Sequence, residues 1–150
     1  MSPFDRDVLA ERTMVVQRHL QRVAERLPPS AADFRSATDA SDAVILHLWQ
    51  ATQIVIDLAM ATCLAMNLGT PSSYADAFRR LQSAGVVDAA RGDRLVRAAG
   101  FRNVVAHACE TLDMARVHEA ATNGPADLLA FIAVVRDRMR LDDHRAASDL

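Results

Sequence analysis

The sequence predicts an all-α fold, a helical bundle with short connections. Half of the 150 residues are apolar (51%) but only 5% are aromatic, and Ala, Leu, Val and Arg dominate over strand-forming aromatic residues. Apolar residues recur at helical spacing in several segments, and Gly and Pro separate these segments. The length suits one core, so we expect residues 1–150 to form a single domain.

The first helix is predicted over about residues 5–27. Its apolar residues follow at steps of seven, four, three and four, which places them on one face: Leu9, Val16, Leu20, Val23 and Leu27. Arginines occupy the other face, where solvent is the default environment. Pro28 and Pro29 end the helix.

A long helix is predicted next, with its N-cap among residues 38–42 and its end near Leu68, before Gly69 and Pro71. It is apolar nearly all round, so it should be the central and most buried element. A membrane span has to be weighed for a helix of this length. We expect no membrane association, because polar side chains share one side of the helix.

These polar side chains are Gln50, Gln53 and Asp57, with His47 nearby. A polar stripe on a buried helix indicates an internal cleft or a subunit interface. Asp57 would be costly to bury without a partner. We therefore consider it either a support of the cleft or a structural carboxylate that bonds a neighbouring helix or an arginine.

Shorter helices follow. Ser73 opens one that ends near Gly85, and another runs over about residues 87–99, where Gly100 separates it from the next segment or kinks it. A brief helix is predicted from residues 111–113 to about Thr122, ended by Asn123 and Gly124. Pro125 starts the last helix, and we expect about residues 142–150 to fray.

The charge balance excludes a dedicated duplex-binding domain, which is usually strongly basic. The net charge is −2, so any RNA contact must be local. Every Lys or Arg position is arginine, which binds phosphate bidentately, although a GC-rich genome explains that bias by itself. The two cysteines form no C-x-x-C pair and no secretory leader is visible, which predicts a reduced, cytoplasmic protein.

Residues 101–109 are the candidate for chemistry, because Arg102, Asn103, His107 and Cys109 lie in an otherwise Ala- and Val-rich stretch. Asn103 and His107 are four apart and share a helical face. Arg102 and His107 are five residues apart and do not share a face on a straight helix. For both to act on one substrate, the helix must break at Gly100 or the long guanidinium side chain must reach around it. Neither belongs to an apolar stripe, so we expect their replacement to leave folding intact.

Metal and cofactor sites are not predicted. His107 and Cys109 could supply two metal ligands, but no second close pair accompanies them. The same two residues point about 160° apart on a helix, which argues against a Cys–His nucleophile pair. Glycine-rich phosphate loops, H-E-x-x-H and nucleophile elbows are absent from the sequence.

The stretch from Gly100 to His107 resembles the HEPN superfamily, in particular the HepT-like toxins of HEPN/MNT toxin–antitoxin pairs. That family carries R-N-x-x-x-H-x-Tyr in an all-α bundle. The resemblance extends to the long helix, to the connection over residues 69–78 and to residues 81–87. It departs at one position, because Cys109 stands where the family has Tyr.

The resemblance implies a metal-independent endoribonuclease that works as a homodimer, or a higher homo-oligomer, with paired motifs in a shared cleft. Arg102 and His107 match the catalytic pair, and Asn103 matches its usual companion. Histidine titrates near neutrality and can move protons, while arginine supplies fixed charge to a phosphorane. The alternative is structural: Arg102 bonds helix carbonyls or Asp57, and His107 caps an interface.

The family also implies a partner, an MNT-type nucleotidyltransferase antitoxin that adds AMP to the motif Tyr. Cys109 has no phenolic hydroxyl, so another residue is modified, or the partner acts by occlusion, or this copy is not a regulated toxin. Tyr74 is the only tyrosine, and nothing in the sequence suggests it as a substitute. A second hypothesis is a catalytically inactive HEPN bundle that binds nucleotides or serves as a scaffold for the nucleotidyltransferase.

Overall fold

The computed structural model describes residues 6–108 and 111–150, and over these ranges the chain is built from helices without a β-strand. The elements in chain order are α1 Arg6–Arg26, the short 3-10 helix η1 Ala31–Asp33, α2 Asp39–Ala65, α3 Tyr74–Ser83, α4 Ala89–Ala108 and α5 Met114–Ser148. The predicted all-α fold is therefore confirmed.

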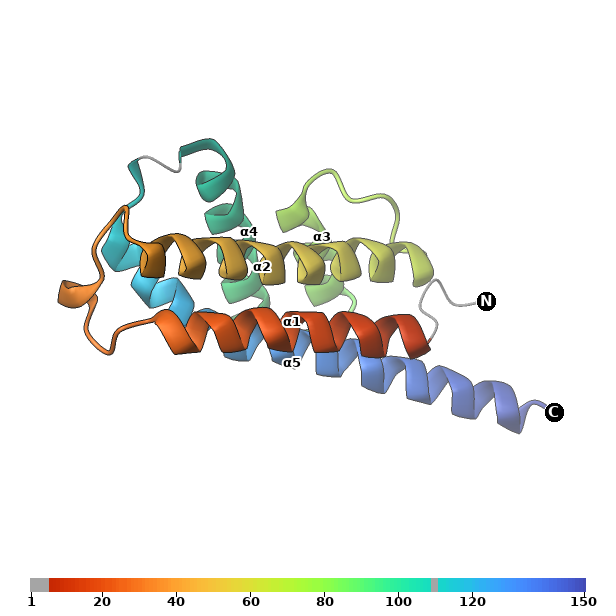
Figure 1. Cartoon of the computed structure of the whole chain (residues 1–150). Helices are drawn as coiled ribbons and strands as arrows, with labels where there is room; N and C mark the ends of the chain where they lie inside the picture. Colours follow the sequence, from red (N-terminus) through yellow and green to blue (C-terminus); the bar gives the residue numbers. More distant parts are fainter. Residues whose placement is uncertain (1–5, 109–110) are drawn as a thin grey trace.

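Helix α2 is the centre of the bundle. It lies antiparallel beside α1, and α5 runs along both (Figure 1). The pair α3 and α4 packs against α2 without contacting α1, so α2 is the one α-helix among the described elements that contacts every other α-helix. By length and composition α2 could also span a membrane, a test that core helices of soluble proteins pass as well. Packing within the bundle buries one side of α2, while Leu46 and Leu64 remain exposed.

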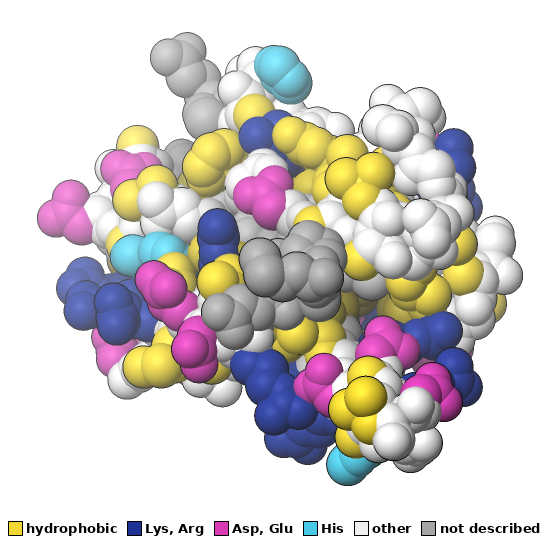
Figure 2. Space-filling model, turned by 90° about the vertical axis from the view of Figure 1, so that its right-hand side faces the viewer, with side chains coloured by type: hydrophobic (Ala, Val, Ile, Leu, Met, Phe, Trp, Pro, Cys, Tyr) yellow, Lys and Arg dark blue, Asp and Glu magenta, His cyan; other side chains and the backbone are white. Residues whose placement is uncertain are grey.

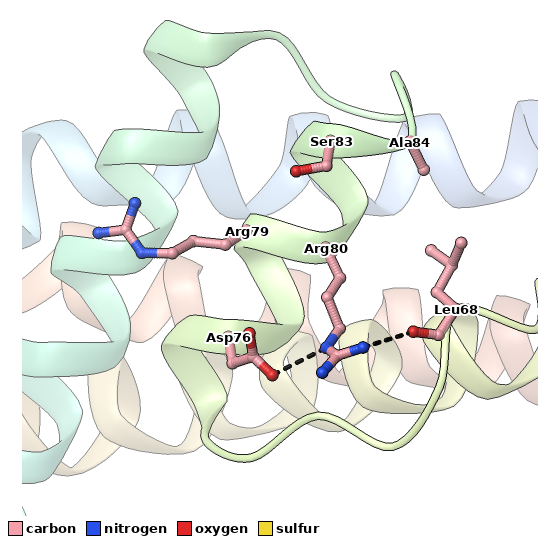
Figure 3. Close-up of a pocket in the computed structure, with 6 residues that line it drawn as sticks. All are labelled: Leu68, Asp76, Arg79, Arg80, Ser83 and Ala84. Carbon is pink, nitrogen blue, oxygen red and sulfur yellow. Dashed lines mark hydrogen bonds and ion pairs between the residues drawn. The ribbon is translucent and has the colours of Figure 1, made fainter.

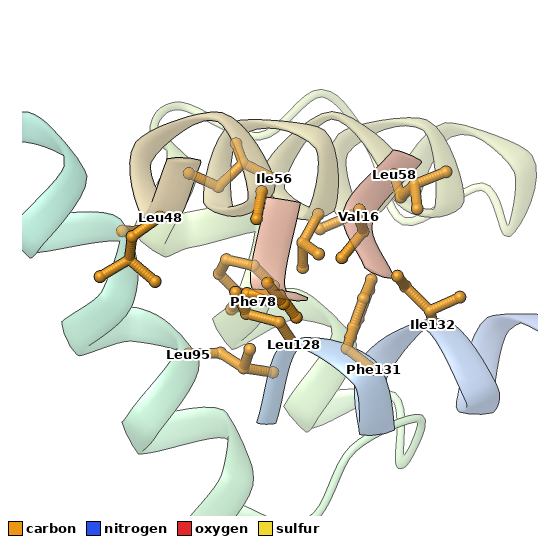
Figure 4. Packing of buried hydrophobic residues seen from close by; sticks show 14 of the residues in the cluster. Val16, Leu48, Ile56, Leu58, Phe78, Leu95, Leu128, Phe131 and Ile132 are labelled. Carbon is orange, nitrogen blue, oxygen red and sulfur yellow. The ribbon is translucent and has the colours of Figure 1, made fainter. Parts of the chain in front are cut away.

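The core is built from all five α-helices (Figure 4). Val16 of α1 and Ile56 of α2 are fully buried, as is Leu95 of α4. Phe78 of α3 meets Phe131 of α5 edge to face, with ring centroids 5.5 Å apart. These contacts join the α3–α4 pair to the α1–α2–α5 layer and fix where α4 crosses α2.

Side-chain caps start α2, α3 and α5, the last through Asp113, which accepts from the Ala115 amide. Thr38 caps α2 in a reciprocal capping box with Ser41. Ser73 caps α3 by accepting from the Asp76 amide, as the sequence predicted. The Asp76 carboxylate instead accepts from the Arg80 guanidinium (2.8 Å) and the Ser72 amide (2.9 Å), which together hold its pKa below the usual value.

Arg80 also ties the end of α2 to α3, because its Nη1 donates to the carbonyl of Leu68 at 2.7 Å. Both groups line a shallow hollow of about 380 Å³ (Figure 3). Arg79 lies at its rim and points toward α4 rather than into it. With Arg80 engaged at both ends, this hollow is part of a structural clamp.

The predicted break at Gly100 is wrong, because α4 runs without interruption from Ala89 to Ala108. Gly in a helix interior costs about 1 kcal/mol relative to Ala. Leu95, Ala99 and Val105 are buried on both sides of Gly100, and this packing offsets the cost.

The predicted boundary at Asn123, Gly124 and Pro125 is also wrong, since α5 is one helix of 35 residues with Pro125 inside it. Buried residues continue at helical spacing before and after the proline, among them Ala121 and Leu128. Tertiary packing therefore overrides a local breaker. Toward the C-terminus, where we expected fraying, the exposed helix extends to Ser148, and Arg6 of α1 donates to Asp143 there.

Candidate active site

Arg102 lies on the side of α4 that faces the bundle. It follows the buried Ala99 by three residues and precedes the buried Val105 by three, so the three share one helical face. The side chain is partly buried and reaches α2. Arg102 is not one of the core residues, as expected from the sequence, but its side chain is held by polar contacts at the crossing with α2.

The guanidinium of Arg102 is held by two aromatic rings and two amides. Its central carbon lies 5.2 Å from the ring centroid of Trp49 and 5.2 Å from that of Tyr74. Its Nε donates to Oε1 of Gln53 at 2.6 Å, and its Nη1 donates to Oδ1 of Asn103 at 3.2 Å. Aromatic faces attract a cation, so these contacts stabilise the charged side chain in one place.

Gln53 extends this network to Asp57. Nε2 of Gln53 donates to Oδ1 of Asp57 at 2.9 Å, one turn further along α2. Asp57 is exposed, and among the described residues its carboxylate bonds neither an arginine nor another helix. Asp57 thus reaches Arg102 through Gln53, and the direct arginine contact that we considered for it is not formed.

His107 lies near the end of α4 and is exposed. Within the described part of the chain, its imidazole makes no hydrogen bond and does not meet Arg102. On the unbroken helix the two side chains point about 140° apart. The structure thus brings together Arg102, Asn103, Gln53 and Asp57 but leaves His107 apart, and Cys109 lies outside the described residues.

Two aromatic residues of this site were missed by the sequence reasoning. Trp49 stands four residues before Gln53, which is itself four before Asp57, so the spacing along α2 could have indicated a shared face. Tyr74 is the first residue of α3, and its approach to Arg102 depends on how α3 and α4 pack. No local signal in the sequence predicts that contact.

Three other histidines, His19, His47 and His118, have structural contacts. His19 of α1 and His47 of α2 approach through their Nδ1 atoms at 2.9 Å. Burial lowers the pKa of His19, and His47 and Arg18 lower it further. His118 contacts the carbonyl of Pro28 at 2.7 Å, which anchors α5 to the end of α1. Within the described ranges no three metal-ligating side chains converge.

Residues 16–135, most of the chain, match the family described as "Ribonuclease HepT-like". This chain belongs to the ribonuclease HepT-like family. A HepT-like relative from Shewanella oneidensis, described as an mRNA nuclease HepT, is 24% identical over 130 residues, covering 87% of this chain and 97% of the relative.

Solved structures show the same HepT-like bundle. The tri-AMPylated Shewanella oneidensis HEPN toxin, in complex with an MNT antitoxin, superposes with a TM-score of 0.77 at 24% identity, covering 87% of this chain and 98% of the toxin. YutE, a cytosolic protein of unknown function from Bacillus subtilis, has a TM-score of 0.77 at 17% identity and 95% coverage of both chains. The HEPN resemblance expected from the sequence is confirmed.

Proposed function

We propose that this chain is a metal-independent endoribonuclease, the toxin component of a HEPN/MNT-type pair. The observation that carries the proposal is the HepT-like family match together with Arg102, which is fixed on α4 beside Asn103 and ahead of an exposed His107. The relative described as an mRNA nuclease supports RNA as the substrate.

Arg102 can stabilise the transition state of RNA cleavage. A guanidinium has five N–H donors, and the contacts to described residues use one at Nε and one at Nη1. Three donors are left for the non-bridging oxygens of a phosphorane. Positive charge fixed before the reaction stabilises developing negative charge without reorganisation.

His107 supplies the proton transfers. The 2′-hydroxyl attacks the adjacent phosphorus, the bond from phosphorus to the 5′-oxygen breaks, and the products are a 2′,3′-cyclic phosphate and a 5′-hydroxyl. The imidazole of His107 serves as base toward the 2′-hydroxyl or as acid toward the leaving oxygen. Two chains with paired motifs would offer one His107 for each role, and Asn103 would orient a phosphate oxygen or the imidazole.

Homodimer formation is part of the proposal. The outward face of α2, which carries Gln53 and Asp57, also exposes Leu46 and Leu64 by 51% and 57%, and Val104 of α4 is exposed by 53%. Exposed large apolar side chains beside a polar site are typical of an interface. A homodimer across this face would line a shared cleft with both motifs.

The charge distribution agrees with a local RNA contact. Basic and acidic side chains are interspersed on the face drawn in Figure 2, without one continuous basic surface there. A protein of this kind holds the RNA through a few phosphates near its site, so affinity should depend modestly on salt.

An MNT-type nucleotidyltransferase is the proposed antitoxin, and the cytoplasm is the proposed compartment. Support comes from the similar HEPN toxin solved with an MNT antitoxin. Cys109 has no phenolic hydroxyl to accept AMP, so modification of another residue or occlusion would neutralise the toxin. Tyr74 meets Arg102 and is the only tyrosine, which makes it the first residue to examine for added AMP.

A non-catalytic HEPN scaffold for a nucleotidyltransferase is the alternative. One observation favours it: Arg102 is engaged inside the chain, while His107 does not meet it. Growth after expression of the wild type, compared with His107→Ala, separates the two. If the wild type stops growth and cleaves RNA, and a folded His107→Ala protein does neither, the enzyme is supported. If the two proteins have the same effect on growth and on RNA, the scaffold is supported.

A further inference from the structure

Gln53 makes the shortest contact with Arg102 and is itself fixed by a second residue. Its Oε1 accepts from Nε of Arg102 at 2.6 Å, while its Nε2 donates to the carboxylate of Asp57 at 2.9 Å. The two ends of one amide therefore face two opposite charges. Gln53 lies 49 residues before Arg102, outside the stretch from Gly100 to His107 that carries the sequence resemblance.

We propose that Gln53 is a positioning residue for RNA cleavage, and that Asp57 sets the orientation of its amide. The proposal rests on the proposed function. Gln53 does not touch the RNA; it fixes the rotation of the Arg102 guanidinium so that its free N–H groups meet the scissile phosphate.

Asp57 selects one of the two orientations of the amide. An ionised carboxylate only accepts hydrogen bonds, so it draws the NH₂ end of Gln53 toward itself. The carbonyl end is then left for Arg102, which only donates. In the flipped orientation the amide would present donors to a donor and an acceptor to an acceptor, and both bonds would be lost.

The aromatic rings around Arg102 hold its guanidinium in place but do not fix its rotation. The hydrogen bond to Gln53 fixes that rotation. Trp49 and Tyr74 both lie within 5.2 Å of the guanidinium carbon and attract it, but a planar cation can still turn against an aromatic face. A directional bond at Nε fixes that angle. Misplacing a transition-state donor by about 1 Å can reduce the rate by about 10²-fold. The orientation of the guanidinium N–H groups that face the phosphate therefore matters for catalysis.

The test is a double-mutant cycle on the full chain, with steady-state cleavage of a short single-stranded RNA. Gln53→Leu removes the acceptor at similar size and should lower kcat by about tenfold, with a smaller change in KM. On the Arg102→Ala background the same substitution should change nothing, because the group that it positions is gone. Gln17→Leu is the control: Gln17 is exposed on α1, has no hydrogen bond to a described residue and should leave kcat unchanged.

Two further variants keep the test decisive if Gln53→Leu fails to fold. Asp57→Leu changes an exposed side chain and should lower kcat by a smaller factor that also vanishes on the Arg102→Ala background. The pair Gln53→Glu with Asp57→Asn keeps the net charge and rebuilds the chain of bonds, with a carboxylate accepting from both neighbours. It should recover most of the kcat lost in Gln53→Leu.

Trp49, the only tryptophan, gives a readout that does not depend on activity. Its fluorescence should change in Gln53→Leu and Arg102→Ala but not in Gln17→Leu. Suppose that wild type cleaves RNA and Arg102→Ala cleaves it at least about 10²-fold more slowly. If Gln53→Leu then retains full kcat, or loses the same factor on both backgrounds, the inference is overturned while the function stands. If wild type does not cleave RNA, the proposed function fails and the inference fails with it.

Discussion

Arg102 should contribute to stability as well as to cleavage, and His107 should not. Arg102→Ala removes two cation–π contacts of about 0.5–1 kcal/mol each at partly exposed positions and a hydrogen bond of about 1 kcal/mol to Gln53. We expect the free energy of unfolding to fall by about 2 kcal/mol. For a chain of this size that corresponds to a melting temperature lower by about 4–8 °C.

The measurement is urea unfolding followed by circular dichroism, because Trp49 fluorescence responds to Arg102 itself. His107→Ala is the matched variant on the same helix; it is exposed and should change stability by less than about 0.5 kcal/mol. Both variants should lose at least about 10²-fold in cleavage rate. Equal stability of Arg102→Ala and His107→Ala at one protein concentration would refute the packing role derived for Arg102.

Three further predictions concern metal, assembly and pH. Cleavage should proceed in EDTA and leave 2′,3′-cyclic phosphate ends; loss on chelation with rescue by magnesium would contradict the mechanism. Light scattering at micromolar concentration should give the mass of two chains, and a monomer would count against the shared cleft. The contribution of His19 to the free energy of unfolding should be fully present above the ordinary histidine pKa of 6.5 and should fall as the pH drops below it. Burial, His47 and Arg18 lower the pKa of His19 in the folded chain, so the unfolded chain takes up the proton first. His19→Gln should flatten this slope in melts between pH 5 and 7, and an unchanged slope would show that other groups cause it.

The helices were predictable wherever apolar spacing and a cap agreed. Thr38 and Ser73 are N-caps as expected, and the stripe on α1 is buried. The errors fall at Gly100 and Pro125, where local breakers lie inside continuous helices. Propensity is a weak term of about 1 kcal/mol for Gly, and packing on both sides of the residue outweighs it.

The site was predictable only in part, for a different reason. Arg102, Asn103 and His107 could be singled out because they are close in sequence and match a family motif. Trp49, Gln53 and Tyr74 join Arg102 through the crossing of α2, α3 and α4, a contact between segments that one sequence does not reveal. Gln53 was recognised as part of a polar stripe, but its partner was not.

The separation of Arg102 and His107 leads to a final prediction about assembly. The two side chains leave an unbroken α4 about 140° apart, with Arg102 bonded to α2 and His107 exposed. One phosphate can meet both groups if a second chain supplies the histidine. Cleavage should then need one Arg102 and one His107 from different chains of a dimer.

Mixed dimers test this arrangement directly. Arg102→Ala and His107→Ala chains are each inactive alone, but a dimer of one with the other holds an intact arginine opposite an intact histidine. Mixing the two proteins under exchange conditions should restore RNA cleavage in part, because the mixed dimer keeps one His107 for one of the two proton transfers. Mixing either protein with a chain that carries both substitutions should restore none. If the first mixture stays inactive although mass spectrometry detects the mixed dimer, each chain must use its own pair, and α4 would have to bend to bring them together.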